Sequence, residues 1–198
     1  MPRKLACFLC HGLVAGYPVD NLAAYLNANT PDGVHFNTVG GADPQPHQSE
    51  ITQEVIATHN GGADIIFGGH SMGADLTFYL ADELKRRNVR APLFISIDST
   101  NWGSNAPGTE PWSTAVGPPN TGRWFVPDNV DRWLHFRQPD PPGGGQALLA
   151  PANATDNLTA FEEPGLLQGG GHLAIPTLPQ VEQKILDAVL AVANASTV

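Results

Sequence analysis

Short apolar runs alternate with helical segments along the first half of the chain. The apolar runs predict buried strands, and the segments between them repeat apolar residues at helical spacing. Strands are expected over residues 4–10, 34–39, 63–69, 92–98, 133–138 and 146–150, and helices over 19–27, 49–60, 72–87 and 178–194. Short apolar strands separated by single helices are typical of a mainly parallel sheet with helices on both faces. The sequence therefore predicts an α/β fold.

A single domain is expected over residues 1–198, because the chain shows no internal repeat and no linker that would divide it. The sequence contains 21 Gly and 18 Pro, which indicates turn-rich loops around the core. A loop of roughly thirty residues follows the strand that ends at Asp98, and loops of that length inside a domain are usually functional.

The charge balance excludes some classes of partner. The formal charge is −9, from 10 basic and 19 acidic residues, so neither nucleic acid nor an anionic membrane is an expected partner, since both require a basic patch. No apolar run approaches the roughly 20 residues of a membrane-spanning helix. We expect a cytoplasmic protein, because no clear signal peptide is present; secretion is the alternative if a leader precedes this sequence. The oligomeric state stays open.

The segment Gly69-His70-Ser71-Met72-Gly73 reads G-x-S-x-G, and it lies between a predicted strand and a predicted helix. That context is the one that a nucleophile elbow requires. The turn exposes the Ser71 hydroxyl, the glycines remove side chains that would collide, and the Met72 N–H faces a developing oxyanion. The alternative interpretation is a Gly-rich turn that carries an ordinary serine.

At this point the chain resembles the α/β-hydrolase superfamily, over residues 4 to about 194. The resemblance rests on the elbow, on the His11-Gly12 turn after the first strand, and on acid and histidine candidates in the order Ser, Asp, His. It implies a minimal α/β-hydrolase fold without a cap domain, similar to small esterases and lipases. It also implies that the turn after the first strand supplies a second oxyanion N–H, here from Leu13 or a neighbour, with Gly12 allowing close approach.

The resemblance implies that His172 is the catalytic base, because it lies in a Gly-rich loop just before the last helix. Its role would be to take the Ser71 proton and return it to the leaving group. The acid is Asp98 or Asp140. Most relatives carry the acid after the later strand, which favours Asp140, but Asp98 ends a buried strand beside the elbow strand, where a carboxylate needs a partner. We prefer Asp98.

Two further features compete for a function. The segment Cys7-Phe8-Leu9-Cys10-His11 matches C-x-x-C-H, the attachment pattern of c-type haem. It also reads as a central strand whose two thiols point to opposite faces, so we expect two buried reduced cysteines, no cofactor and no metal. In the long loop, Trp102, Trp112 and Trp124 either line a substrate pocket or anchor the loop to the domain.

The expected activity is hydrolysis of small-molecule carboxylic esters through an acyl-enzyme intermediate. A thioesterase or an amidase with the same Ser-His-Asp triad is the near alternative, because the triad does not distinguish these leaving groups. A hydrolase-fold binding protein without turnover is the alternative of another class. The natural substrate and its acyl-chain length are not indicated by the sequence.

Overall fold

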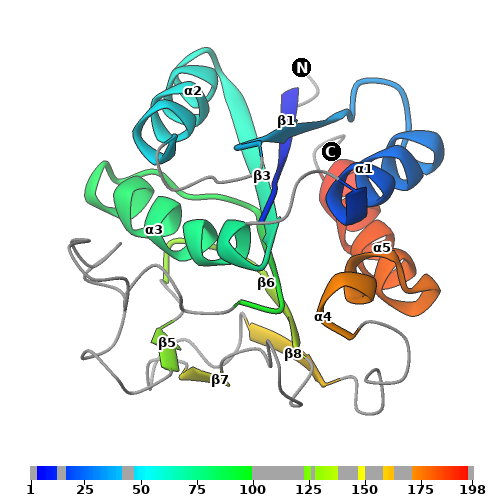
Figure 1. Cartoon of the computed structure of the whole chain (residues 1–198). Helices are drawn as coiled ribbons and strands as arrows, with labels where there is room; N and C mark the ends of the chain where they lie inside the picture. The colour runs from blue at the N-terminus through cyan, green and yellow to red at the C-terminus, as the bar shows by residue number, and fades with distance from the viewer. Residues whose placement is uncertain are drawn as a thin grey trace.

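A computed structural model describes residues 4–12, 17–41, 47–99, 123–125, 128–137, 147–149, 158–162 and 171–195, the last group including the C-terminal helix. Its elements alternate between strands and helices (Figure 1). In chain order they are β1 (Lys4–Cys10), α1 (Tyr17–Asn29), β2 (Phe36–Val39), α2 (Gln48–Asn60), β3 (Ala63–His70), α3 (Met72–Arg86), β4 (Leu93–Ile97), β5 (Arg123–Phe125), β6 (Trp133–Arg137), β7 (Ala147–Leu149), β8 (Leu158–Glu162), α4 (Gly171–Ala174), the 3-10 turn η2 (Ile175–Thr177) and α5 (Pro179–Ala195).

Six of these strands form one sheet in the order β2-β1-β3-β4-β6-β8. Every neighbouring pair in it is parallel, so the carboxyl ends of all six strands lie at the same edge. The strand order reverses at β1, because β2 lies on one side of β1 and β3 lies on the other. In open α/β sheets, ligands bind outside the carboxyl ends of the strands near such a reversal.

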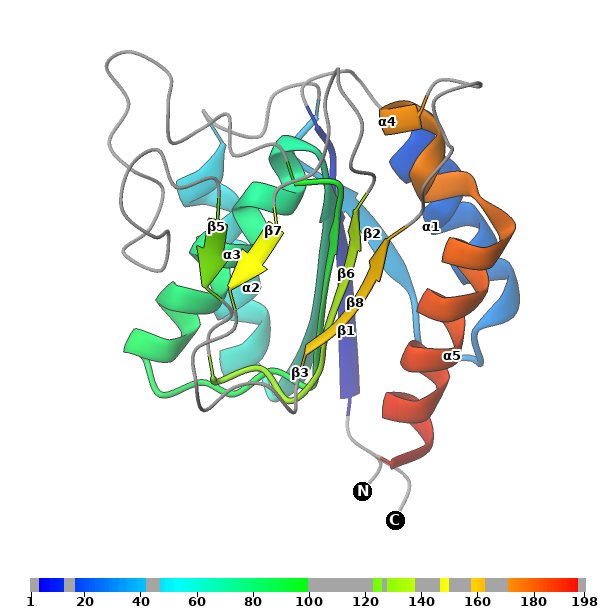
Figure 2. The same ribbon diagram turned by 90° about the horizontal axis from the view of Figure 1, so that it is seen from below.

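Helices cover both faces of the sheet, as the strands' apolar character predicts. α1 and α5 lie on one face, and α2 and α3 lie on the other (Figures 1 and 2). One apolar cluster joins Leu22, Ile95 and Ile185 beneath α1 and α5, and a second joins Val55, Phe67 and Leu76 beneath α2 and α3. The two faces of the sheet are therefore covered by helices. A substrate site is expected at the edge formed by the carboxyl ends of the strands, which these helices do not cover.

The strands and helices that the sequence predicts are largely confirmed, with two corrections. The predicted strand over 146–150 is present as β7, which pairs with β5 in a separate two-stranded sheet. β8 pairs with β6 at the end of the main sheet, where no strand was expected. His172 was expected in a loop, but it lies in the short helix α4, which Figure 2 places at the end of the molecule away from the two termini.

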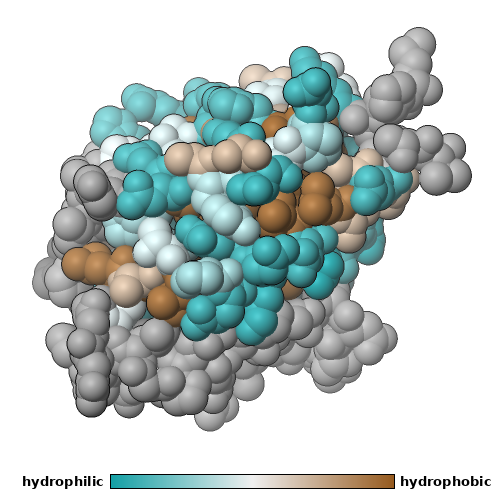
Figure 3. All heavy atoms as spheres, turned by 90° about the vertical axis from the view of Figure 1, so that its right-hand side faces the viewer, coloured by the Kyte–Doolittle hydropathy of each residue, from teal (hydrophilic) through white to brown (hydrophobic). Residues whose placement is uncertain are grey.

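The outer face formed by α1 and α5 carries hydrophilic and hydrophobic residues side by side (Figure 3). The partly buried residues Tyr25, Leu178 and Leu190 pack against the core beneath it. Among the described residues, no helix has both the length and the apolar character needed to cross a membrane.

Candidate active site

Ser71 lies between β3 and α3 with a backbone conformation that serines rarely adopt. Its φ is 58° and its ψ is −123°, and such a conformation costs on the order of 1–3 kcal/mol unless its surroundings hold it. Here the Ser71 N–H donates to the Ile97 carbonyl at the end of β4, at 3.0 Å. The backbone of Ser71 thus forms the sharp strand-to-helix turn that a nucleophile elbow requires.

The two glycines of the pentapeptide are required by close packing. A side chain at Gly69 would collide with the backbone of Gly73 and Ala74, across the turn. A side chain at Gly73 would collide with the carbonyls of Cys10 and His11, at the end of β1. The glycines therefore allow α3 to begin directly against β1 and β3.

The turn after β1 packs against the Ser71 side chain. A Cβ added to Gly12 would lie 2.7 Å from Ser71 Cβ and 3.2 Å from Ser71 Oγ. The preceding residue is fixed on both sides, because His11 N–H donates to the Val39 carbonyl at 3.0 Å and His11 Nε2 lies 2.9 Å from Asp20 Oδ1. The structure thus brings the turn that was predicted to supply an oxyanion donor against Ser71. Leu13, the expected second donor, lies outside the described residues.

Met72 is the first residue of α3, and its side chain is buried. The first N–H groups of a helix have no partner within the helix and carry its positive dipole end. The Met72 N–H therefore begins α3 directly after Ser71, the position in which the sequence predicts an oxyanion donor.

His172 and Asp98 meet at the carboxyl end of β4. The His172 Nδ1 lies 2.6 Å from the Asp98 Oδ2. Asp98 is fully buried, has a positive φ of 48° and donates its N–H to the Phe136 carbonyl at 2.8 Å. The His172 side chain keeps 19 % of its surface exposed. Asp98, one of the two acid candidates, therefore lies beside His172, and the other candidate, Asp140, lies outside the described residues.

His70 also contacts His172. The two imidazole rings have centroids 4.6 Å apart, and His70 Nε2 lies 2.7 Å from the His172 carbonyl oxygen. Since a carbonyl only accepts, the proton of His70 is on Nε2. Burial, together with the neighbouring His172, lowers the pKa of His70 to about 3. The residue just before Ser71 is therefore a neutral donor to the residue paired with Asp98.

The comparisons with solved structures support this arrangement at the level of the fold. The chain is similar to the NocB thioesterase domain, seen as a covalent complex with a fluorophosphonate nocardicin G analog, at 15% identity and TM-score 0.55, covering 93% of this chain and 94% of that one. It is also similar to the esterase of Pyrobaculum calidifontis, at 12% identity and TM-score 0.57, over 100% of this chain and 78% of that one.

A third similar structure is RedJ, the thioesterase from the prodiginine pathway of Streptomyces coelicolor, at 15% identity and TM-score 0.52, over 94% of this chain and 89% of that one. The chain has the α/β-hydrolase fold. No protein-family model matches its sequence, and no curated protein is similar to it in sequence. The assignment of the α/β-hydrolase fold thus rests on the similarity in structure.

Two further contacts hold the segments of this candidate site. Asp75, in the first turn of α3, accepts a hydrogen bond of 2.5 Å from the Ser99 hydroxyl, and both residues are fully buried. This bond ties the helix after Ser71 to the turn that carries Asp98. Asp20 similarly holds His11 from the start of α1. Neither partner could be chosen from spacing along the chain, because the contacts depend on how the loops converge.

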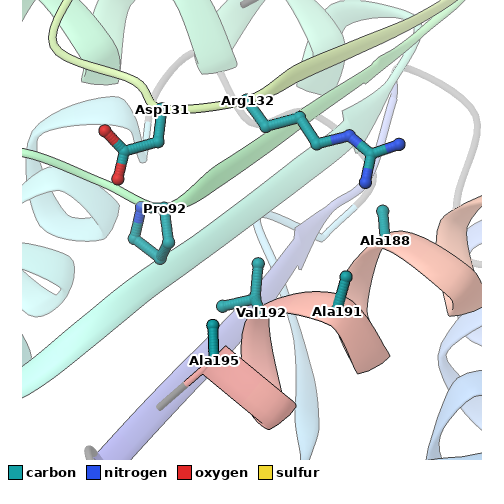
Figure 4. A pocket seen from close by; sticks show the side chains of 7 residues that line it. All are labelled: Pro92, Asp131, Arg132, Ala188, Ala191, Val192 and Ala195. Carbon is teal, nitrogen blue, oxygen red and sulfur yellow. The ribbon is translucent and has the colours of Figure 1, made fainter. Parts of the chain in front are cut away.

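The aromatic residues proposed for a pocket are only partly accounted for. Trp102 and Trp112 lie outside the described residues, and Trp124 is described only as part of the backbone of β5. A hollow of about 260 Å³ is present elsewhere, lined by Pro92, Arg132 and Val192 among others (Figure 4). It lies at the amino end of β4, whereas Asp98 follows the carboxyl end, so it is separate from the candidate site.

The C-x-x-C-H segment forms the interior of the sheet. Cys7 packs in the apolar cluster on the α1 and α5 face, and Cys10 packs in the cluster on the opposite face. Both are free thiols, and burial raises the pKa of Cys7 to about 12 and that of Cys10 further still. Within the described part of the chain, no group of three or more metal-ligating side chains is found.

Proposed function

We propose that the protein is a serine hydrolase of carboxylic esters. The observation that carries the proposal is the strained backbone of Ser71, held at the start of α3 with the Gly12 turn against its hydroxyl. Strain of this kind persists where a function requires it. Similarity to esterases and thioesterases of the same fold supports the proposal.

In the proposed mechanism, His172 accepts the Ser71 proton as the hydroxyl oxygen bonds to the carbonyl carbon of the ester. The negative charge moves to the carbonyl oxygen, where the Met72 N–H donates to it. The bond to the leaving alcohol then breaks, and His172 protonates that alcohol. Water next attacks the acyl-Ser71 ester and gives its proton to His172, and collapse of this second intermediate releases the acid and restores Ser71.

Asp98 sets which nitrogen of His172 takes the proton. With Nδ1–H donating to the Asp98 carboxylate, the unprotonated nitrogen of the neutral imidazole is Nε2, which therefore acts as the base. Once the ring is charged, the same carboxylate stabilises the imidazolium. The buried position of Asp98 makes this pairing strong, because little water competes for the carboxylate.

Thioesters are the second candidate substrate class, because two of the similar structures, NocB and RedJ, are named thioesterases. The described geometry is indifferent to the leaving atom: the same nucleophile, base and oxyanion donor serve an alkoxide or a thiolate. The choice between the two classes therefore depends on relative kcat/KM for matched oxygen and sulfur esters.

A series of p-nitrophenyl esters of increasing acyl length tests the proposal, with the matching acyl thioesters assayed beside it. We expect turnover by the wild type and its loss in Ser71→Ala. Ser49→Ala, a serine in the first turn of α2, is the matched control and should keep full activity. Absence of turnover on every ester and thioester, or equal turnover by Ser71→Ala, would contradict the proposal and favour a binding protein.

A further inference from the structure

The backbone carbonyl of His172 has an unusual partner. In an α-helix this carbonyl would accept from the N–H of the residue four positions later. That residue is Pro176, which has no N–H. The carbonyl is instead met by His70 Nε2 at 2.7 Å, from a residue 102 positions away in the sequence.

α4 is short, and it cannot fix His172 by its own hydrogen bonds. It spans four residues and passes directly into the three-residue turn η2. Isolated helical turns of this length are not stable in water. External contacts must therefore set the position of His172, and the described ones are the Asp98 carboxylate on the ring and His70 on the main chain.

We infer that His70 is a positioning residue, whose imidazole N–H holds the main chain of His172 so that the His172 ring reaches both Asp98 and Ser71. Because His70 is also the last residue of β3, the same residue sets the end of the strand that carries the nucleophile and the position of the base. This inference rests on the proposed function, and it adds a role for the variable residue of the G-x-S-x-G segment.

The protonation state of His70 suits this role. Its burial keeps the ring neutral, so that His70 can lie with its ring centroid 4.6 Å from that of His172 without opposing a positive charge there. A lysine or arginine at the same position would also donate to the carbonyl, but it would place a charge beside the imidazolium that forms during turnover. A neutral imidazole can both donate to the His172 carbonyl and lie beside the His172 ring without adding a charge.

Four variants test the inference. His70→Phe keeps the ring and removes the donor, and we expect kcat to fall roughly ten- to a hundredfold with KM nearly unchanged, since a displaced base costs rate more than binding. His70→Gln places an amide N–H near the Nε2 position and should recover most of that loss, whereas His70→Asn is too short and should not. His59→Phe is the matched control: it removes a histidine hydrogen bond to the Ala63 carbonyl, 3.0 Å long, at the other end of β3.

Wild-type kcat in His70→Phe, or equal kcat in His70→Gln and His70→Asn, would overturn the inference. If His70→Phe does not fold, the comparison of His70→Gln with His70→Asn tests the inference. Both of these variants lose the imidazole ring, so they differ only in how far the amide donor reaches. Amide hydrogen exchange over residues 171–177 is a measurement that does not depend on activity. Its rate should rise in His70→Asn but not in His70→Gln or His59→Phe. If the wild type hydrolyses nothing, the proposed function fails, and equal exchange in Gln and Asn would separately overturn the role of His70.

Discussion

The Nδ1 of His172 lies 2.6 Å from the Oδ2 of Asp98, although 74 positions separate the two residues in the chain. The contact joins the turn after β4 to the short helix that precedes α5. Because the parallel sheet places the carboxyl ends of β1, β3 and β4 side by side, the same edge also holds Gly12 and Ser71. Gly12, Ser71, Asp98 and His172 thus come to this edge from four separate segments of the chain.

Replacing Asp98 tests its assignment as the acid. Asp98→Asn should lower kcat on the order of 10⁴-fold, because the amide no longer favours the His172 tautomer that accepts at Nε2. Asp140→Asn should leave kcat within a few-fold of the wild type. Steady-state ester hydrolysis by the two variants is the measurement, and a collapse in Asp140→Asn alone would show that the other aspartate is the acid.

We expect that only glycine fits at position 12, because the turn packs closely against Ser71. In Gly12→Ala the new methyl group would lie 2.7 Å from Ser71 Cβ and 3.1 Å from the His70 carbonyl oxygen, so the turn or the nucleophile must move. We expect kcat to fall about 10²-fold. Gly33→Ala is the control, because its φ of +91° makes alanine strained while no atom lies within 4 Å. It should cost about 1 kcal/mol of stability and leave kcat unchanged; equal kcat in the two variants would refute the steric account.

The low pKa of His70 makes stability depend on pH. In the unfolded chain His70 binds a proton below about pH 6.5, whereas in the folded protein it does so only below about pH 3. Between these values unfolding takes up a proton, so acidification lowers the free energy of unfolding by up to about 1.4 kcal/mol per pH unit from this group. Above about pH 6.5 both states are neutral and the contribution is constant.

Urea unfolding of the wild type and of His70→Gln at pH 7 and pH 5 measures this dependence. The wild type should lose more stability than the variant over that interval, because only the wild type carries the buried imidazole. Other titrating groups contribute equally to both proteins and cancel in the comparison. If the variant loses as much stability as the wild type, His70 is not a buried imidazole that stays neutral in the folded protein.

The two cysteines should be unreactive toward thiol reagents in the native protein. Cys7 and Cys10 have no exposed surface, and burial raises the pKa of both thiols. An aromatic disulfide reagent at pH 8 should therefore titrate no thiol until denaturant is added, and then two. Rapid reaction of a thiol under native conditions would mean that the centre of the sheet opens easily.

The sequence predicts the parts of this fold whose local pattern and tertiary role agree. The apolar run over residues 63–69 predicts β3 because the strand is buried on both faces, and the pentapeptide places Ser71 at its end. β8 was not predicted, since its residues 158–162 pair only with β6 and show no apolar run that a central strand would require. Its existence depends on a neighbour far along the chain.

Some residues of the candidate site can likewise be predicted from local sequence, and others cannot. Ser71 and Gly12 can be selected from local sequence, because close backbone approach demands glycine and the elbow has a fixed pattern. The pairing of His172 with Asp98 depends on how loops converge, so spacing along the chain leaves two aspartates as candidates, and the structure describes only the contact of Asp98. The bond from His70 to the His172 carbonyl could not be selected from spacing, although Pro176 marks a carbonyl that needs an outside donor.

Reaction with a fluorophosphonate tests the central claim most directly, because an activated serine takes up the phosphonyl group of this reagent with loss of fluoride, whereas an ordinary serine reacts very slowly. The account predicts that the wild type gains one phosphonyl group, located on the peptide that contains Ser71 by mass spectrometry, and that Ser71→Ala gains none while Ser49→Ala reacts as the wild type does. An unlabelled wild type, or equal labelling of Ser71→Ala, would contradict it.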